Sequence, residues 1–260
     1  MTKKIPYLAE EAIEKDVESL LAEFAHARNV VIETPIPIED IIEKHLKLGV
    51  EFDDTHRLFG IPHSGLNLGE GPDILGAIFF TEKRIVIDES LDPEDNPSKE
   101  GRYRFTLAHE GGGHWRLHRH LFAKDAAQTS LFQGQNVPSV ICRSNQTKEP
   151  VEWQADFYAS CLLMPRKLVF AAWDEMFPDR KPRVLAPENP INHPFVEVPR
   201  ISCHLGDVDW SESDNDALDG IARPFAEKFL VSPIAMRIRL EKLGLLHRVV
   251  PHQQIFAGGS

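Results

Sequence analysis

The spacing of apolar residues along the chain predicts several helices. Near the beginning, four apolar residues recur at steps of four, three and four with charged residues between them: Ile13, Val17, Leu20 and Phe24. This spacing is typical of an amphipathic helix. Further helices are expected over about 38–48, 102–121, 149–164, 224–229 and 234–243. The last of these follows Ser232 and Pro233, a capping residue and a proline at the first helical position.

Only one stretch of the chain has the pattern of β-strands. The apolar runs 76–80 and 84–88 lie on either side of the turn-like residues 81–83 and predict an antiparallel hairpin. The segment 50–72 is rich in Gly, Asn and Asp, and we expect it to be irregular.

The composition changes after residue 176 and suggests a division of the chain. Six prolines and an acidic run fall within 177–218, so we expect an insertion with little regular structure that contributes no metal ligand. The predicted parts are an N-terminal helical extension (1–34), a central domain (35–176), this Pro-rich and acidic insertion (177–218), and a helical C-terminal module (219–260).

Charge and cysteine content narrow the class of protein. The chain of 260 residues has a formal charge of −11, which disfavours nucleic-acid binding over the whole surface. No apolar run approaches the ~20 residues that a membrane-spanning helix needs, and the first residues do not have the pattern of a secretory signal. The three cysteines are widely spaced and predict neither a disulfide framework nor a Cys-based metal site. These features indicate a cytoplasmic protein with no membrane partner.

Four histidines between positions 109 and 120 are the strongest chemical signal. His109 and Glu110 begin a near match to H-E-x-x-H, in which two histidines bind zinc and the glutamate activates a water. However, His114 comes one residue late. In an α-helix, residues five apart differ by about 140° around the axis, so they cannot bind one ion together. A π-bulge at 111–113, where three glycines follow one another, would return both imidazoles to one face.

The spacing alone also allows a second pair of histidines to bind a metal ion. His114 and His118 are four residues apart and could bind a metal ion from a regular α-helix. No glutamate follows His114 directly, so this pair would explain metal binding better than catalysis.

The next predicted helix offers a third ligand. Glu152 and Asp156 are four residues apart and share a helix face. A carboxylate of Glu152 would suit zinc beside two imidazoles. Asp156 could accept a hydrogen bond from the outer nitrogen of a ligating histidine and so orient its ring. Two acidic residues on a solvated helix face are the alternative interpretation.

Two longer segments resemble the signatures of the ImmA/IrrE family of metallopeptidases. The first is Arg104-Phe-Thr-Leu-Ala-His-Glu followed by Gly-His-Trp and a further histidine, and the second is Glu152-Trp-Gln-Ala-Asp-Phe-Tyr-Ala-Ser-Cys-Leu-Leu-Met-Pro165. The segment 231–245 also fits the family pattern, and the resemblance covers roughly 35–170 and 222–246. The family pattern is H-E-x-G-H, whereas this chain has H-E-G-G-G-H, with one residue inserted.

This resemblance implies an α+β fold: a small zincin-like metallopeptidase domain with a short β-sheet beside the ligand-bearing helices, and a helix-turn-helix-like C-terminal part. It implies a cytoplasmic gluzincin-type endopeptidase that cleaves a helix-turn-helix repressor or antitoxin. His109, His114 and Glu152 would then bind Zn²⁺, with Mn²⁺ as the other candidate metal, and Glu110 would be the general base. The rival functions are a zinc-binding regulator without proteolysis and a DNA-binding regulator acting through the C-terminal helices.

A few further residues are candidates for supporting roles. Tyr103 and Tyr158 could donate to an oxyanion, although each also fits the pattern of a packed aromatic. We expect His118 to lie on the surface or beside a metal ligand rather than to bind the metal. We expect the substrate to pair with a free edge of the strand 84–88. The tail carries four cations, for which we expect partner docking rather than DNA binding: Arg237, Arg239, Lys242 and Arg248.

Overall fold

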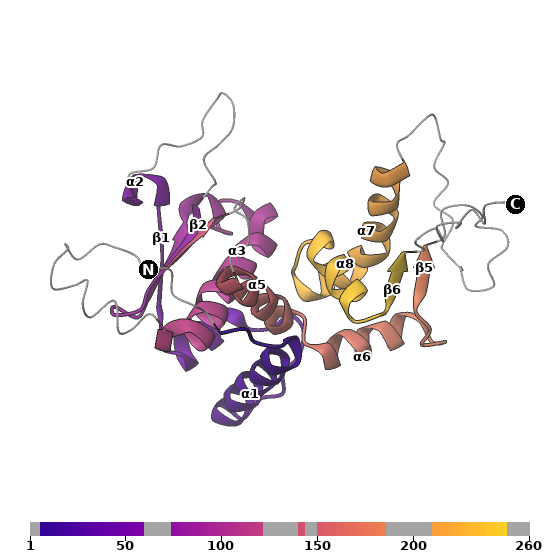
Figure 1. The fold of residues 1–260 in the computed structure, drawn as a ribbon, viewed down its shortest axis with the longest axis horizontal. Coiled ribbons are helices and arrows are strands. Elements are labelled where there is room, and N and C mark those ends of the chain that lie inside the picture. Colours follow the sequence, from indigo (N-terminus) through magenta and orange to yellow (C-terminus); the bar gives the residue numbers. More distant parts are fainter. Residues whose placement is uncertain (1–5, 60–73, 122–139, 144–149, 186–209, 249–260) are drawn as a thin grey trace, which may run out of the picture.

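A four-stranded mixed sheet forms one end of the molecule (Figure 1). The computed structural model describes residues 6–59, 74–121, 140–143, 150–185 and 210–248. The strands are β1 (Gly49–Asp53), β2 (Ile74–Phe79), β3 (Arg84–Asp88) and β4 (Val140–Arg143), in the order β1-β3-β2-β4. β2 is antiparallel to both β3 and β4, which confirms the predicted hairpin, whereas β1 is parallel to β3.

Helices pack in layers against this sheet. Next to it lie α3 (Glu100–Leu107) and the central π-helix (Ala108–His118), which continue one another along the chain. The next layers are α5 (Pro150–Leu163) and then α1 (Glu10–Arg28), as Figure 1 shows. Two shorter helices complete this part, a π-helix at Asp40–His45 and α2 at Thr55–Phe59. The mixed architecture confirms the expected α+β class.

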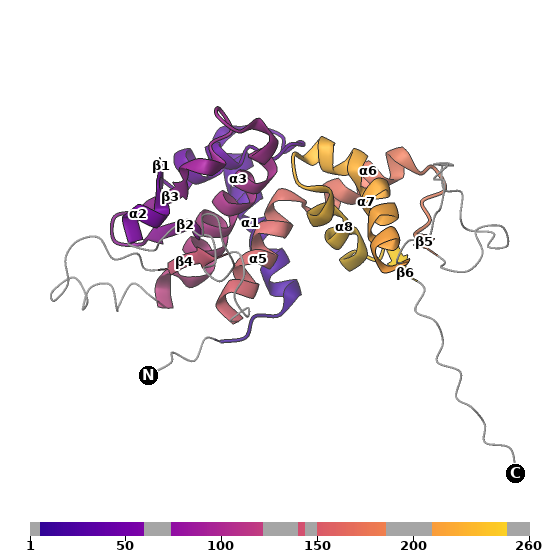
Figure 2. The same cartoon turned by 90° about the horizontal axis from the view of Figure 1, so that it is seen from above.

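The second part of the molecule is largely helical. It contains α6 (Arg166–Met176), α7 (Trp210–Phe229), α8 (Pro233–Lys242) and a parallel pair of short strands, β5 (Arg183–Leu185) and β6 (Leu246–Arg248). Figure 2 shows this part beside the sheet-containing part, with α6 extending from the end of α5. Ser232 accepts a hydrogen bond from the backbone N–H of Ala235 at 3.1 Å, so it is the predicted cap of α8. No helix in the described ranges is long and apolar enough to cross a bilayer.

The structure corrects the expectation of little regular structure in two segments. Within 50–72, residues 49–53 form β1 and 55–59 form α2, while 60–72 lie outside the described residues. Within 177–218, β5 and the first turns of α7 are regular, and 186–209 lie outside the described residues. The acidic run falls at the beginning of α7, where the helix dipole favours negative charge. The helix also continues through Pro224, because its apolar face is buried at Leu218, Ala222 and Phe225.

The N-terminal helix is bound to the helices of the central part by ion pairs and hydrogen bonds. Arg116 of the central π-helix contacts Asp16 at 3.0 Å and Glu23 at 2.7 Å, both on α1. Hydrogen bonds and charge attraction from Arg116 lower the pKa of Glu23 to about 2, although its partial burial opposes this. The buried hydroxyl of Tyr158, on α5, donates to the same Asp16 at 2.9 Å. α1 therefore holds the central π-helix and α5 together.

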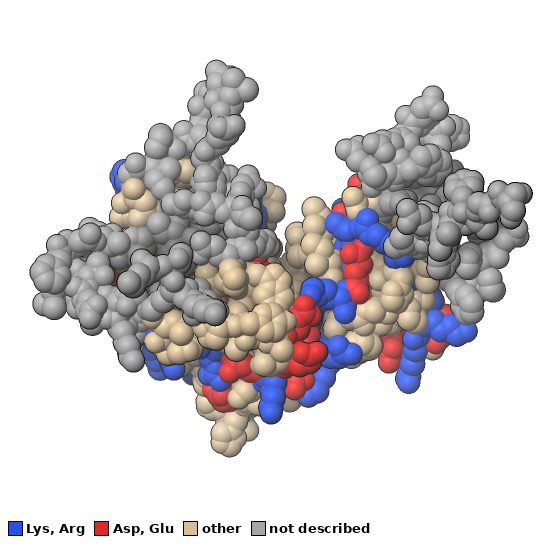
Figure 3. Space-filling view, viewed as in Figure 1, with Lys and Arg blue, Asp and Glu red and all other residues tan. Residues whose placement is uncertain are grey.

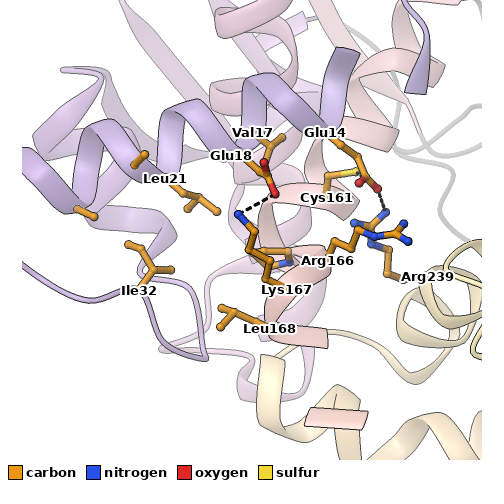
Figure 4. A pocket seen from close by; sticks show the side chains of 13 residues that line it. Glu14, Val17, Glu18, Leu21, Ile32, Cys161, Arg166, Lys167, Leu168 and Arg239 are labelled. Carbon is orange, nitrogen blue, oxygen red and sulfur yellow. Dashed lines mark hydrogen bonds and ion pairs between the residues drawn. The ribbon is translucent and has the colours of Figure 1, made fainter. Parts of the chain in front are cut away.

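A buried arginine connects the C-terminal helices to the rest of the fold. Arg239 of α8 donates to the carbonyl oxygen of Met164 at the end of α5, at 3.1 Å, and to Glu14 of α1 at 2.8 Å. Figure 4 shows this ion pair at one end of a cavity of about 230 Å³ between α1, α5 and α6. Cys161 also lines the cavity, and burial raises the pKa of its thiol to about 12.

The three glycines of the central π-helix let neighbouring elements approach its backbone. A Cβ at Gly111 would lie 2.4 Å from Cδ1 of Ile42, and one at Gly112 would lie 2.9 Å from the ring of Tyr158. A Cβ at Gly113 would lie 2.6 Å from Cα of Ala155 on α5. Side chains at these positions would force the π-helix away from its neighbours, so close packing is a second reason for glycine here.

We expect Gly113→Ala to destabilise the protein by about 1–3 kcal/mol, because the new methyl group meets the α5 backbone, which cannot rotate away. The matched control is Gly220→Ala in α7, where a Cβ has no described atom within 4 Å. That variant should be neutral or more stable by about 0.5–1 kcal/mol, because alanine favours a helix. Urea unfolding measures both, and equal stability of the two variants would contradict the packing described for Gly113.

Candidate metal centre

The eleven-residue central π-helix places two histidines on one face. Its i→i+5 hydrogen bonds bring residues five apart about one turn apart. The Nε2 atoms of His109 and His114 lie 3.0 Å from each other, and both side chains are buried. The predicted π-type distortion is thus confirmed, and it is longer than the single bulge expected at the three glycines.

A carboxylate from α5 completes a triangle of donor atoms. Glu152 places Oε2 3.2 Å from Nε2 of His109 and Oε1 3.6 Å from Nε2 of His114. Zinc with ligands at 2.0–2.2 Å in tetrahedral geometry separates its donor atoms by about 3.3–3.5 Å. The three observed separations scatter around that value. Two imidazole nitrogens and one carboxylate oxygen therefore fit a zinc ion in both chemistry and spacing.

A second carboxylate lies beside the same histidines. Donor atoms of His109, Glu110 and His114 lie within 4.8 Å of one another, so this group could hold a metal ion as well. Glu110 is fully buried, and neither of its oxygens has a hydrogen-bond partner among the described residues. Its Cγ lies against β2, 3.5 Å from where a Cβ at Gly76 would be. Such a carboxylate needs a proton, a cation or a polar ligand to compensate its burial.

Burial and mutual contacts shift the titration of all these groups. Burial raises the pKa of Glu110 to about 8; the Glu152 charge acts in the same direction and His109 opposes it. Burial lowers the pKa of His114 to about 4, although the neighbouring carboxylate of Glu152 opposes this. Burial alone would raise the pKa of Glu152, but the close contacts of its carboxylate with the imidazoles of His109 and His114 hold the pKa well below its usual range. At neutral pH the site therefore offers a neutral imidazole at His114 and a charged carboxylate at Glu152, as a metal ion requires.

Each histidine also has a partner at its outer nitrogen. Nδ1 of His109 lies 2.9 Å from Oδ1 of Asp156, one turn along α5 from Glu152. A carboxylate there accepts a hydrogen bond from the N–H at Nδ1. The lone pair of His109 is then on Nε2, where it can bind a metal. Nδ1 of His114 lies 3.1 Å from Nδ1 of His118. His118 is buried too, and its Nε2 lies 3.0 Å from Oε1 of Gln154.

The structure places the other sequence candidates elsewhere. The hydroxyl of Tyr158 is directed to Asp16 on α1, and Tyr103 packs against Phe52 of β1 with ring centroids 5.5 Å apart. Burial raises the pKa of both tyrosines. His56 lies on α2, where it lines a separate cavity of about 230 Å³ beside Asp88. Three further histidines lie outside the described residues: His63, His193 and His204.

Gln154 is the site residue that the sequence analysis missed. It lies between Glu152 and Asp156 on α5, and its Nε2 donates to the backbone carbonyl of Pro6 at 2.9 Å. The available signal was the pair His114 and His118, four residues apart, because a second buried histidine needs a polar partner. Nothing in the sequence indicated that the partner would come from α5.

The raised pKa of Glu110 gives a prediction for the metal-free protein. Because the pKa of Glu110 is about 8 in the folded protein and its ordinary value is 4.5, wild-type stability falls as pH rises between these values. Glu110→Gln does not lose stability in this way, because glutamine does not ionise. Without metal, the variant should gain stability over wild type on the order of a few kcal/mol between pH 5 and pH 8. Urea unfolding with a chelator measures it, with Glu227→Gln on the exposed side of α7 as control. A stability difference that does not change with pH would contradict the burial described.

Comparisons with known proteins identify no family for the chain. No protein-family model matches it, and no curated protein matches it. Among solved structures, the chain is similar to a Mycobacterium tuberculosis transcriptional regulator, with 11% sequence identity and a TM-score of 0.43. That match covers 90% of this chain and 48% of the regulator, so the chain spans about half of the regulator's length.

Proposed function

We propose that the protein is a zinc-dependent endopeptidase. One observation carries the proposal: Nε2 of His109, Nε2 of His114 and the Glu152 carboxylate lie 3.0–3.6 Å apart, beside a separate buried carboxylate. His109, His114 and Glu152 would hold the ion, and two nitrogens with one oxygen favour Zn²⁺ over Mn²⁺, which prefers more oxygen ligands. When bound, zinc would polarise a peptide carbonyl and lower the pKa of a coordinated water.

Glu110 is the general base in this proposal. Its carboxylate lies within 4.8 Å of the histidine donor atoms, close enough to reach a water bound beside the ion. It would accept a proton from the attacking water and deliver it to the leaving amine. Burial raises the pKa of this carboxyl to about 8 in the metal-free site. The positive charge of a bound ion would lower it again, toward the range that suits a group that must both accept and donate a proton.

The substrate position expected from the sequence is wrong. β3 pairs with β1 on one side and with β2 on the other, so it has no free edge for a peptide. The edge strands of the sheet are β1 and β4. β4 pairs with β2 around Gly76, the residue that lies against Glu110, and no described strand covers its other edge. We therefore place an extended substrate at β4.

The substrate class in this proposal is a helix-turn-helix repressor or antitoxin. This part rests on the two sequence signatures and on the histidine and carboxylate geometry that accompanies them. A protease acting on such a protein would release transcription in the cytoplasm.

The geometry of the tail disfavours the DNA-binding alternative. All four tail cations have acidic partners within the molecule: Arg237 with Asp219, Arg239 with Glu14, Lys242 with Glu10, and Arg248 with Glu241. Figure 3 shows Lys and Arg interspersed with Asp and Glu on the described face, without a continuous basic surface. Phosphate binding needs Lys and Arg side chains that can contact the phosphates and so displace the counterions of the nucleic acid. A gel shift that weakens steeply with salt would reverse this conclusion.

Two substitutions separate the proposed ligand from the proposed base. His109→Ala should lose most of its zinc and some stability, because the variant lacks one of the three proposed zinc ligands. Glu110→Gln should keep near-wild-type zinc content but lose at least ~10²-fold in cleavage rate. Zinc is measured by mass spectrometry, and cleavage is measured on a set of purified helix-turn-helix repressors and antitoxins. His120→Ala, at an exposed position shortly after the central π-helix, is the control and should change neither quantity.

The two readouts also test the zinc-regulator alternative. Loss of zinc in Glu110→Gln would mean that Glu110 is a ligand. Cleavage that is unchanged in Glu110→Gln would contradict the proposed mechanism. Zinc bound by wild type with no cleavage of any of these proteins would favour a zinc-binding regulator without proteolytic activity.

A further inference from the structure

We propose that His118 and Gln154 are positioning residues that fix the metal-binding nitrogen of His114 through a relay of hydrogen bonds from the backbone carbonyl of Pro6. The inference rests on the proposed metal site and extends it to residues that do not touch the ion. Three consecutive contacts form the relay, from Pro6 through Gln154 and His118 to His114, and each is within hydrogen-bond distance.

The relay begins at a backbone carbonyl oxygen, which can act only as a hydrogen-bond acceptor. The carbonyl oxygen of Pro6 can only accept a hydrogen bond, so the side-chain atom of Gln154 that lies 2.9 Å from it must be the amide NH₂. The other amide atom of Gln154 is therefore the oxygen, which is an acceptor. Nε2 of His118 lies 3.0 Å from this oxygen, so it must carry a proton and donate it.

The proton positions of both histidines follow from this contact. A neutral imidazole with a proton on Nε2 has a lone pair on Nδ1, so His118 accepts at Nδ1. Nδ1 of His114 lies 3.1 Å away and must be the donor. The lone pair of His114 is then on Nε2, the atom that is 3.0 Å from Nε2 of His109 and 3.6 Å from Glu152. The relay thus selects the one tautomer of His114 that can bind the ion.

The same geometry argues against the metal site on His114 and His118. In that register both Nδ1 atoms would have to bind the metal, but in the relay they share the proton of a hydrogen bond. His118 and Gln154 are both about 1% exposed, so water does not replace their mutual hydrogen bond. At His109 the corresponding contact is direct, because the carboxylate of Asp156 lies 2.9 Å from Nδ1. The carboxylate of Asp156 thus orients His109, whereas the uncharged side chains of His118 and Gln154 orient His114.

The first test is zinc affinity, measured by chelator competition on the full-length protein. His118→Phe keeps an aromatic ring but removes the acceptor, and it should weaken zinc binding by about 10–100-fold. His118→Asn places an amide oxygen near the former Nδ1 and should restore affinity to within about threefold of wild type, on the order of the error of such comparisons. His120→Phe is the control at an exposed position and should bind as wild type.

The possible results of this assay test the relay and the metal site separately. No zinc binding by wild type would overturn the proposed metal site itself. Wild-type affinity in a folded His118→Phe, or equal losses in His118→Phe and His118→Asn, would overturn the relay and leave only a packing role. If His118→Phe does not fold, Gln154→Met decides by the same assay, because it removes the acceptor for His118 while keeping a side chain of similar length.

A second readout needs neither metal nor variants that fold poorly. Nitrogen-15 NMR of the imidazoles in metal-free wild type reports which ring nitrogen carries the proton. We expect the proton on Nδ1 of His114 and on Nε2 of His118. The opposite tautomer at either histidine would overturn the relay whatever the affinities are.

Discussion

The i→i+5 backbone of the central π-helix is the constraint on which the candidate site depends. One residue more than an α-helix permits separates His109 from His114, and the π-helical ladder removes the resulting mismatch over Ala108–His118. Runs of this conformation are rare, because their hydrogen bonds alone do not favour them over an α-helix. The surrounding packing must therefore stabilise the longer one seen here.

That packing comes chiefly from α5. Ala155 lies against Gly113, while Glu152 and Asp156 on the same helix contact the two histidines, so one helix both supports the distorted backbone and supplies the polar groups. α1 holds this pair in place, because Asp16 accepts from Tyr158 of α5 and pairs with Arg116 of the central π-helix. The N-terminal helix is thus part of the support of the site rather than an appendage to it.

The sequence predicted the features that depend on local spacing. The hairpin, the amphipathic α1 and the π-type distortion at the glycines follow from patterns within about twenty residues, and all three are present. The features it did not predict depend on distant partners. β1 is a strand because it pairs in parallel with β3, and that pairing removes the free edge expected for the substrate. The position of Gln154 depends on the carbonyl of Pro6, 148 residues away in the chain.

The most direct test of the account is a crystal structure of the zinc-loaded protein with anomalous data at the zinc edge. The account predicts one ion bound by Nε2 of His109, Nε2 of His114 and a carboxylate oxygen of Glu152, with the central π-helix intact and Glu110 outside bonding distance. An ion bound by His114 and His118 on a regular α-helix, with His109 directed away from it, would contradict the account.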